Sequence, residues 1–350
     1  MTSRERLLTA IHNDTPDRVP VGPFDLGRLP RDSAIARDLI RITDPFIQCG
    51  LGGDPVWGQN CPTERIQDGR DRITIVRTPL GDMRSVWRST DVASATVEYF
   101  CSTPEDAEKW LSIPYTPPEP DLADFYRVKQ EIGEEGLVLA GMGDAICLPA
   151  SLYSPEDFCL LWLDAPDVMR RLVQTAANRI NAYIERACSL GMDAFRIVGG
   201  EYASVQLGPR AFQELVVEPD RELCDIMRRH GAVAYYHNHG PVTRFYEQFV
   251  DIGMHALDPM EAPPWGDCNL EEAKQKLGGK VCLVGNLDDM EIMESLEWSE
   301  IEPVASERLL QAGPDGFVLG GTASGTYGEH AAQMFMKLVP LAEALASRWN

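Results

Sequence analysis

The feature that most constrains the fold of this chain is a repeated alternation of short apolar runs with longer amphipathic segments. The apolar runs predict strands over Val19–Gly22, Leu137–Gly141, Ala194–Val198, Val233–Tyr236, His255–Leu257, Val281–Gly285 and Gly316–Leu319. The amphipathic segments predict helices over Ala165–Ser189, Pro209–His230, Pro241–Gly253, Leu270–Leu277 and Glu329–Ser347. Repeated strand–helix units are typical of a parallel sheet that is covered by helices. The sequence therefore predicts an α/β fold.

Polar residues and glycines gather where the predicted strands end. They are Gly143-Asp144, Gly199-Gly200-Glu201, His237-Asn238-His239, Asp258, Asn286 to Asp288, and Thr322 to Ser324. In a (β/α)8 TIM barrel the active site lies at the carboxyl ends of the strands, and many strands contribute to it. An open α/β sheet would instead concentrate such residues at one switch point. The distribution over six strand ends favours the closed barrel.

The chain is predicted to be one domain over residues 1–350. Its 350 residues exceed the roughly 250 that such a barrel typically needs. Residues 72–88 alternate around Pro79–Asp82, which predicts an antiparallel β-hairpin inserted between barrel units. We find no internal repeat, low-complexity tract or long linker that would divide the chain.

Charge and composition exclude several classes of partner. Acidic residues outnumber basic ones 54 to 32, for a formal charge of −22, and such a field repels nucleic acid. No apolar run approaches the roughly 20 residues that span a bilayer. The charged, amphipathic N-terminus lacks a signal-peptide pattern, so we expect a cytoplasmic protein without membrane contact. Nine cysteines without a C-x-x-C pair indicate neither a disulfide framework nor a zinc ribbon.

The histidine pair in Tyr236-His237-Asn238-His239-Gly240 is the strongest candidate for chemistry. Because His237 and His239 are two residues apart at a strand end, both side chains lie on one face. Neutral imidazole suits zinc, and Glu201 at the preceding strand end could complete a three-ligand site or act as a general base. The alternatives are a histidine that only orients substrate or donates a structural hydrogen bond, and a Glu201 that caps a loop or pairs with an arginine.

Further candidates rest on weaker signals. Asp144, Asp54 and Tyr153 are candidate catalytic residues. The candidate substrate-binding residues are Arg28, Asn286, Asp288 and Ser324. Several of these residues could equally serve in a turn, a surface charge or core packing. No Walker loop or G-x-G-x-x-G motif is present. The Asp-x-His-x-x-Gly signature of proteins that carry their own cobalamin is also absent.

Several short motifs spread along the chain resemble the uroporphyrinogen decarboxylase superfamily. They include Asp17 to Val21, Ala140-Gly141, Gly208 to Phe212, His237 to Gly240, Lys280 to Asp288, and Gly316 to Gly320. The resemblance implies a (β/α)8 barrel and two branches of activity. One branch decarboxylates uroporphyrinogen without metal. The other contains zinc-dependent methyltransferases that move methyl groups between a corrinoid protein and an acceptor such as a thiol.

The match to the methyltransferase branch is incomplete at the metal ligands. The H-x-C-G motif of that branch corresponds to His237-Asn238-His239-Gly240, in which histidine replaces cysteine. A further cysteine ligand is expected near Thr322–Ser324, where this chain has none. The resemblance therefore implies His237 as a ligand and His239 with altered ligand chemistry. It leaves Glu201 as a substitute for a missing thiolate.

We therefore predict a zinc-dependent methyltransferase of corrinoid-linked one-carbon or demethylation metabolism. It would act on a small-molecule methyl donor or acceptor, with the corrinoid carried by a separate partner protein, and it would be a monomer or homodimer. The first alternative is a metal-free carboxy-lyase, which the acidic strand ends disfavour because uroporphyrinogen carries many carboxylates. The second is a non-catalytic barrel that binds a corrinoid or another small molecule.

Overall fold

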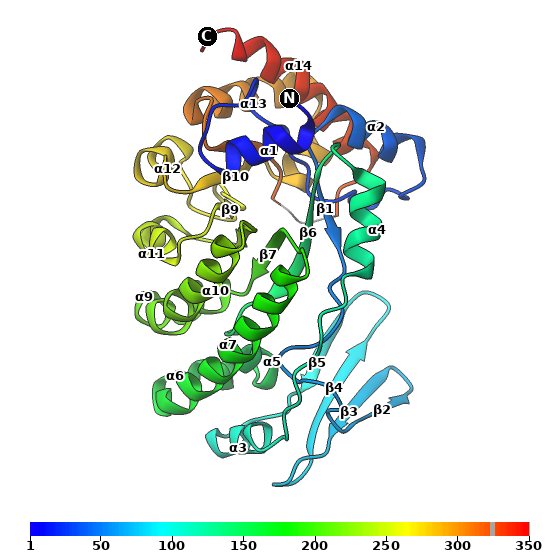
Figure 1. Ribbon diagram of the computed structural model, residues 1–350, viewed down its shortest axis with the longest axis vertical. Helices are drawn as coiled ribbons and strands as arrows, with labels where there is room; N and C mark the ends of the chain where they lie inside the picture. Colours follow the sequence, from blue (N-terminus) through cyan, green and yellow to red (C-terminus); the bar gives the residue numbers. More distant parts are fainter. Residues whose placement is uncertain (323–325, 350) are drawn as a thin grey trace.

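The computed structural model describes residues 1–322 and 326–349. In this part of the chain, a curled sheet of seven parallel strands is surrounded by helices (Figure 1). The strands are β1 (Phe46–Cys49), β6 (Leu137–Gly143), β7 (Ala194–Val198), β8 (Val233–His237), β9 (Ala256–Asp258), β10 (Cys282–Asn286) and β11 (Phe317–Gly320). They lie side by side in the order β1-β6-β7-β8-β9-β10-β11. The predicted α/β fold with a parallel sheet is thus confirmed. Because the strands are parallel, their carboxyl ends all lie at the same edge of the sheet.

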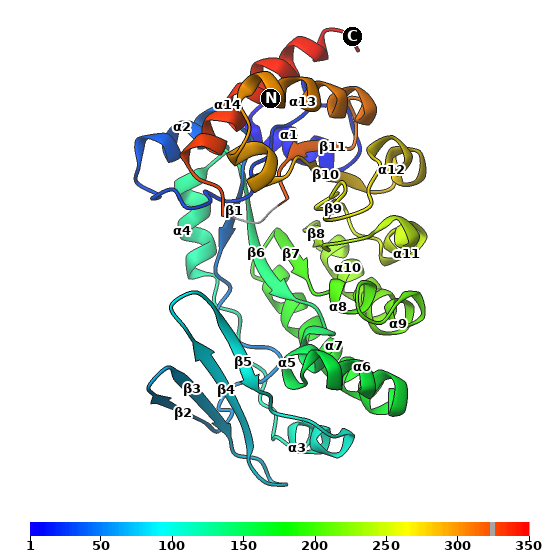
Figure 2. The ribbon, with the colours of Figure 1, turned by 180° about the vertical axis from the view of Figure 1, so that it is seen from behind.

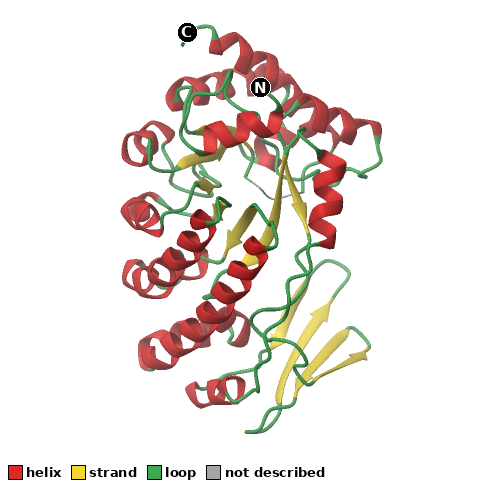
Figure 3. Ribbon diagram, viewed as in Figure 1, coloured by secondary structure: helices red, strands yellow, loops and turns green. Residues whose placement is uncertain are grey.

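Helices lie on the outside of this curled sheet (Figure 3). The α-helices are α1 (Ser3–Ile11), α2 (Ala34–Ile42), α3 (Ala107–Leu111), α4 (Ala123–Ile132), α5 (Cys147–Leu152), α6 (Pro155–Asp164), α7 (Pro166–Ser189), α8 (Glu201–Ser204), α9 (Pro209–Phe212), α10 (Glu218–Arg229), α11 (Tyr246–Ile252), α12 (Leu270–Leu277), α13 (Trp298–Ala312) and α14 (Glu329–Ala346). Short 3-10 or π segments are η1 (Pro104–Asp106), η2 (Gln213–Val217), η3 (Thr243–Phe245) and η4 (Asp289–Glu294). None of these described helices combines the length and the apolar composition that a bilayer-spanning helix needs.

The longest helix shows why the sequence pattern predicted these elements well. α7 begins with a proline at its first turn, where the missing N–H costs nothing. Met169, Leu172, Ala176 and Ile180 recur at helical spacing and are all buried. α7 packs against the neighbouring helices α10, α5 and α6, and burial of each large apolar side chain of the stripe contributes roughly 1.5–3 kcal/mol.

A separate apolar cluster fills the inside of the curl. Each of the seven strands contributes at least one fully buried side chain to it, among them Phe46, Leu139 and Val318. Leu7 and Ile11 of α1 belong to the same cluster, so α1 closes the end of the sheet opposite the strand ends. The described residues that line the pocket below all lie at the opposite end, after the carboxyl ends of the strands.

The first predicted strand, Val19–Gly22, is not a regular strand. The segment lies between the two edge strands and makes isolated bridges to both, from Val21 to β11 and from Phe24 to β1. The Gly22 amide donates to the Leu319 carbonyl at 2.9 Å, and the Phe46 amide donates to the Pro23 carbonyl at 3.0 Å. Because Pro20 and Pro23 have no N–H, the segment cannot complete a ladder. Strand β1, which the sequence pattern did not predict, lies beside it.

A second sheet is inserted between β1 and β6. It is antiparallel and has four strands, β2 (Thr63–Asp68), β3 (Asp71–Val76), β4 (Met83–Ser89) and β5 (Ser94–Glu98). The predicted hairpin at residues 72–88 corresponds to β3 and β4, so the prediction of its extent was too short. β2 and most of β5 are exposed and polar, which weakens the alternating apolar signal. The sheet lies at the end of the molecule away from both termini (Figures 1 and 2).

Candidate active site

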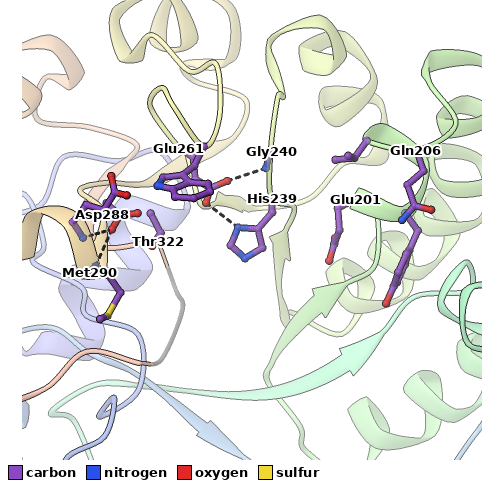
Figure 4. Close-up of a pocket in the computed structure, with 12 residues that line it drawn as sticks. Glu201, Gln206, His239, Gly240, Glu261, Asp288, Met290 and Thr322 are labelled. Atoms are coloured by element: carbon purple, nitrogen blue, oxygen red, sulfur yellow. Dashed lines mark hydrogen bonds and ion pairs between the residues drawn. The ribbon is translucent and has the colours of Figure 1, made fainter. Parts of the chain in front are cut away.

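A cavity of about 510 Å³ lies at the carboxyl ends of five neighbouring strands (Figure 4). The described residues that line it are Glu201, Tyr202, Val205, Gln206, His239, Gly240, Glu261, Trp265, Asp288, Met290, Glu291 and Thr322. They follow β7, β8, β9, β10 and β11 in turn. This volume is in the range of small-molecule sites, which span roughly 300–1,000 Å³. The structure thus brings together most of the strand ends at which the sequence concentrates polar residues.

His237 is the last residue of β8 and is held by a carboxylate on the neighbouring strand. It lies directly opposite Asp258 of β9 in the parallel register. Its Nδ1 is 3.1 Å from each carboxylate oxygen of Asp258, and both side chains are buried. Because a carboxylate only accepts hydrogen bonds, this contact places the proton on Nδ1. The lone pair of the neutral ring is then on Nε2.

His239 repeats this arrangement at the wall of the cavity. Its Nδ1 is 2.9 Å from Oε1 of Glu261, while Oε2 of Glu261 accepts from the Gly240 amide at 2.8 Å. The hydrogen bond to Glu261 raises the pKa of His239 above its ordinary value, against the opposing effect of burial. The His237 and His239 rings meet edge to face, with centroids 4.4 Å apart. The predicted pair therefore lies together, and each ring is oriented by its own carboxylate.

A buried cluster of acidic groups lies close to Glu201. The Tyr236 hydroxyl is 2.7 Å from Oδ2 of Asp220 and 3.3 Å from Oδ2 of Asp144. All three residues are at most 2% exposed. Burial raises the pKa of Asp144 well above its ordinary value, and the nearby charges of Asp220 and Glu201 add to the effect. Burial also raises the pKa of Asp220, to about 7, although hydrogen bonds from Tyr236 and Asp144 oppose it.

The hydrogen-bond geometry explains how these groups coexist. A hydroxyl has one proton, which Tyr236 donates to Asp220 across the shorter contact. The contact with Asp144 is a hydrogen bond only if Asp144 is protonated and donates to the tyrosine oxygen. The chain of proton donation therefore runs from Asp144 through Tyr236 to Asp220. Asp144, predicted to be catalytic, is buried behind the cavity wall and is not among the residues that line the cavity.

The glycines before Glu201 allow the backbone to pass over this cluster. A Cβ at Gly199 would lie 2.1 Å from Oδ1 of Asp144, and one at Gly200 would lie 2.6 Å from Oδ1 of Asn238. Gly199 also has φ of 136°, which side-chain-bearing residues rarely adopt. Gly199 and Gly200 are therefore required for close packing, and they place Glu201 at the cavity.

The fit of a metal to this site is partial. A histidine that ligates a metal usually binds it through one ring nitrogen and donates the N–H of the other to a carboxylate. His237 and His239 both have the carboxylate contact, to Asp258 and Glu261. Catalytic zinc, however, uses three protein ligands. Within residues 1–322 and 326–349, no three His, Cys, Asp or Glu side chains are placed to hold a metal ion together. Oε2 of Glu201 is buried and has no hydrogen-bond partner among these residues. Its role as third ligand stays a prediction.

Besides Asp144, two further candidate catalytic residues lie outside this cavity. The Oδ1 atom of Asp54 accepts from the amides of Val56 and Trp57 at 2.9 and 3.0 Å, so it stabilises a turn. The Tyr153 side chain is buried, and its hydroxyl donates to the Thr103 carbonyl at 3.0 Å. The geometry gives both residues structural contacts, and neither lines the cavity.

The candidate substrate-binding residues are also separated by the structure. Arg28 has a side chain that is 61% exposed and lies 3.6 Å from Glu294. Asn286 is buried and donates to the Met260 carbonyl. Asp288 lines the cavity, and its Oδ1 accepts from the amides that begin η4, at 2.8 Å from Met290 and 2.6 Å from Glu291. Ser324 lies outside the described residues.

Sequence reasoning did not select Asp220, Asp258, Glu261 or Tyr236 as site residues. A signal existed for Asp220, because it shares the buried face of its helix with Val216 and Leu223 at helical spacing. A carboxylate on an apolar helix face is costly unless it is paired or protonated. For Asp258 and Glu261, the signal was only that they follow a predicted strand.

Family comparison agrees with the motifs. The family model described as "Uroporphyrinogen decarboxylase (URO-D)" matches residues 91–342, well over half of the chain. The chain belongs to the uroporphyrinogen decarboxylase family, as the motifs predicted. A search of curated proteins finds no matching sequence.

Solved structures share the fold. A "methyltransferase from Methanosarcina mazei" superposes with a TM-score of 0.66 over 97% of this chain and 99% of its own, at 13% identity. A putative vitamin-B12-independent methionine synthase from Listeria monocytogenes gives a TM-score of 0.44 at 15% identity, over 67% of this chain and 71% of its own. The first likeness establishes a common fold over nearly the whole chain. At these scores and identities, neither likeness assigns an activity.

Proposed function

We propose that this chain is a methyltransferase that acts on a small-molecule methyl donor or acceptor, with a corrinoid on a separate protein as the other methyl carrier. Membership of the uroporphyrinogen decarboxylase family and the fold shared with the M. mazei methyltransferase support this class. The observation that carries the proposal is the His239–Glu261 pair at the cavity wall, because it provides a proton where a methyl group could change carriers.

The chemistry that this pair supports is general acid–base catalysis. When a methyl group leaves an oxygen, nitrogen or sulfur atom of its donor, the bonding electron pair stays on that atom. A proton from the His239 imidazolium would neutralise the departing group, and Glu261 stabilises the imidazolium at 2.9 Å. Transfer in the opposite direction uses neutral His239 to accept the proton of the attacking group. Such positioned proton transfer typically contributes about 10²–10⁴-fold in rate.

The charge of the cavity argues against the carboxy-lyase alternative. Glu201, Glu261, Asp288 and Glu291 line it, and no lysine or arginine is among its described lining residues. A substrate with several carboxylates needs basic partners, so these side chains would repel uroporphyrinogen. They are compatible with a neutral or cationic methyl compound.

Zinc belongs to the proposal as a second form of the same site, in which Nε2 of His237, Nε2 of His239 and Glu201 would hold the metal. In that form the metal takes the place of the proton on Nε2 of His239, so His239 would not act as an acid or base. When bound, zinc would act as a Lewis acid toward the methyl donor or acceptor. The carboxylate contacts of both histidines support this choice. Since the described residues hold no preformed set of three ligands, the proton-transfer steps above do not use the metal.

A methyl-transfer assay with reduced cobalamin tests the proposal. Wild-type protein is incubated with a panel of methylated phenols, amines and thiols, and methylation of the cobalt is followed by visible absorbance. His239→Gln should lower kcat by about 10²–10⁴-fold while the protein stays folded. His230→Gln is the matched control, because His230 pairs with Glu185 at 2.6 Å on the surface.

Three outcomes would overturn the proposal. An unchanged rate in His239→Gln would remove the proposed role of the pair. Rapid decarboxylation of uroporphyrinogen by the wild-type protein would favour the carboxy-lyase alternative. Binding of cobalamin without turnover of any donor or of uroporphyrinogen would favour the non-catalytic alternative.

A further inference from the structure

The inserted sheet has a second cavity on one of its faces. Its volume is about 750 Å³, and it shares no lining residue with the candidate active site. In the antiparallel register, Arg65 lies opposite Thr74, and Thr74 lies opposite Ser85. Residues opposite one another share a face, and so do residues two apart in one strand. Arg65, Arg72, Thr74 and Ser85 therefore lie on the same face, and all four line this cavity.

The arginines of this sheet differ in their pairing. Residues 63–98 contain six arginines. Four of them form ion pairs, namely Arg70 with Asp91, Arg77 with Glu64, Arg84 with Glu98, and Arg88 with Asp71. Arg65 and Arg72 have no ion pair with any residue in 1–322 or 326–349, although the chain has a formal charge of −22. The two arginines without carboxylate partners are the two that face the cavity.

The other wall of the cavity is aromatic. Trp57 and Phe100 line it, and their ring centroids are 5.6 Å apart. Both belong to the segments that flank the sheet along the chain. The one carboxylate among the lining residues is that of Asp54, and its Oδ1 accepts from two backbone amides. The cavity thus combines two guanidinium groups without carboxylate partners among the described residues, the hydroxyl side chains of Thr74 and Ser85, and an apolar wall. The Arg72 guanidinium also lies 5.8 Å from the centroid of the Trp87 ring.

We propose that this cavity binds an organic anion with a carboxylate or phosphate group attached to a flat apolar body. Arg65 and Arg72 are diagonal neighbours on adjacent strands, so their heads can approach one anionic group from two sides. Guanidinium forks bind carboxylate and phosphate oxygens through paired hydrogen bonds, and Thr74 and Ser85 offer further donors. The flat part packs on Trp57 and Phe100. This site is independent of the proposed methyltransferase activity.

Calorimetric titration of the full chain with phenyl phosphate tests the proposal. Inorganic phosphate supplies the anion without the ring, and benzyl alcohol supplies the ring without the charge. Phenyl phosphate should bind more tightly than either, and added salt should weaken it. Benzoate compared with phenyl phosphate distinguishes a carboxylate ligand from a phosphate ligand.

Variants of the two arginines provide the decisive comparison. The double variant R65Q/R72Q should weaken phenyl phosphate binding by at least about tenfold, because charge-assisted hydrogen bonds are lost. The matched control R70Q/R88Q removes two arginines of the same sheet that already have acidic partners, and it should change affinity by less than about threefold. The single variants R65Q and R72Q supply the test if the double variant does not fold. Wild-type affinity in the arginine variants, or no binding of either anion at millimolar concentration, would refute the site.

Discussion

The buried carboxyl of Asp220 should make the stability of this protein fall as the pH rises. Its pKa is raised from an ordinary value of 3.8 to about 7, with burial as the largest cause. In the folded protein Asp220 therefore keeps a proton that the unfolded chain releases near pH 4. The stabilisation that this proton provides is complete below the unfolded pKa, and it is lost as the pH rises through the folded pKa.

The magnitude follows from the two pKa values. Between pH 5 and pH 7 the folded state holds up to one proton more than the unfolded state. A difference of one full proton lowers the free energy of unfolding by about 1.4 kcal/mol for each unit that the pH rises. Because the group is half ionised near pH 7, the loss is about 2 kcal/mol over this range and approaches about 3 kcal/mol at pH 9. Burial, and next the charge of Asp220, raise the pKa of the neighbouring Asp144 well above its ordinary value.

The perturbation is Asp220→Asn, which keeps the size of the side chain and an acceptor for the Tyr236 hydroxyl but cannot ionise. Urea unfolding, followed by tryptophan fluorescence, is measured at each pH unit from 5 to 9 for both proteins. The difference between variant and wild type reports the titration of Asp220 together with its effect on Asp144, since the remaining groups are common to both. The variant should gain about 2–3 kcal/mol relative to wild type as the pH rises from 5 to 9.

The control is Asp225→Asn on the same helix. The Asp225 side chain is 43% exposed and pairs with Arg228 at 2.7 Å. Its replacement should change the free energy of unfolding by less than about 1 kcal/mol at every pH. A difference between Asp220→Asn and wild type that does not vary with pH would refute the protonation of Asp220 in the folded state.

Three further outcomes are expected. Tyr236→Phe removes the hydroxyl between two buried carboxyl groups and should cost about 1–3 kcal/mol in urea unfolding; an unchanged midpoint would show that the hydroxyl is not needed. Leu139→Ala removes most of a fully buried side chain inside the curled sheet and should lower the free energy of urea unfolding by about 2–5 kcal/mol. Leu163→Ala, at a position that is 71% exposed, should lower it by much less. Zinc should bind at about one per chain by elemental analysis and be lost in His237→Ala; stoichiometric metal in that variant would place the metal elsewhere. Zinc content should begin to fall above the ordinary histidine value of 6.5 as the pH is lowered, because the contact with Glu261 raises the pKa of His239.

Local sequence patterns determined the framework of this protein. The predicted strand Ala194–Val198 and helix Leu270–Leu277 have the same bounds in the structure, because continuous buried runs and helical spacing depend on residues within a few positions of one another. The strand ends also indicated where polar side chains would gather, since parallel strands end at one edge. The histidine pair followed from the two-residue period of a strand.

Tertiary structure decided which side chains meet. His237 contacts Asp258 and His239 contacts Glu261 because β8 and β9 pair in a particular register, across 21 and 22 residues of sequence. Asp220 joins the buried cluster because its helix packs against β8. Asp144 does not line the cavity, and the Gly199 backbone lies directly against its carboxyl group. Contacts of this kind depend on strand register and on the path of the connecting chain, which no local pattern of apolar and polar residues encodes.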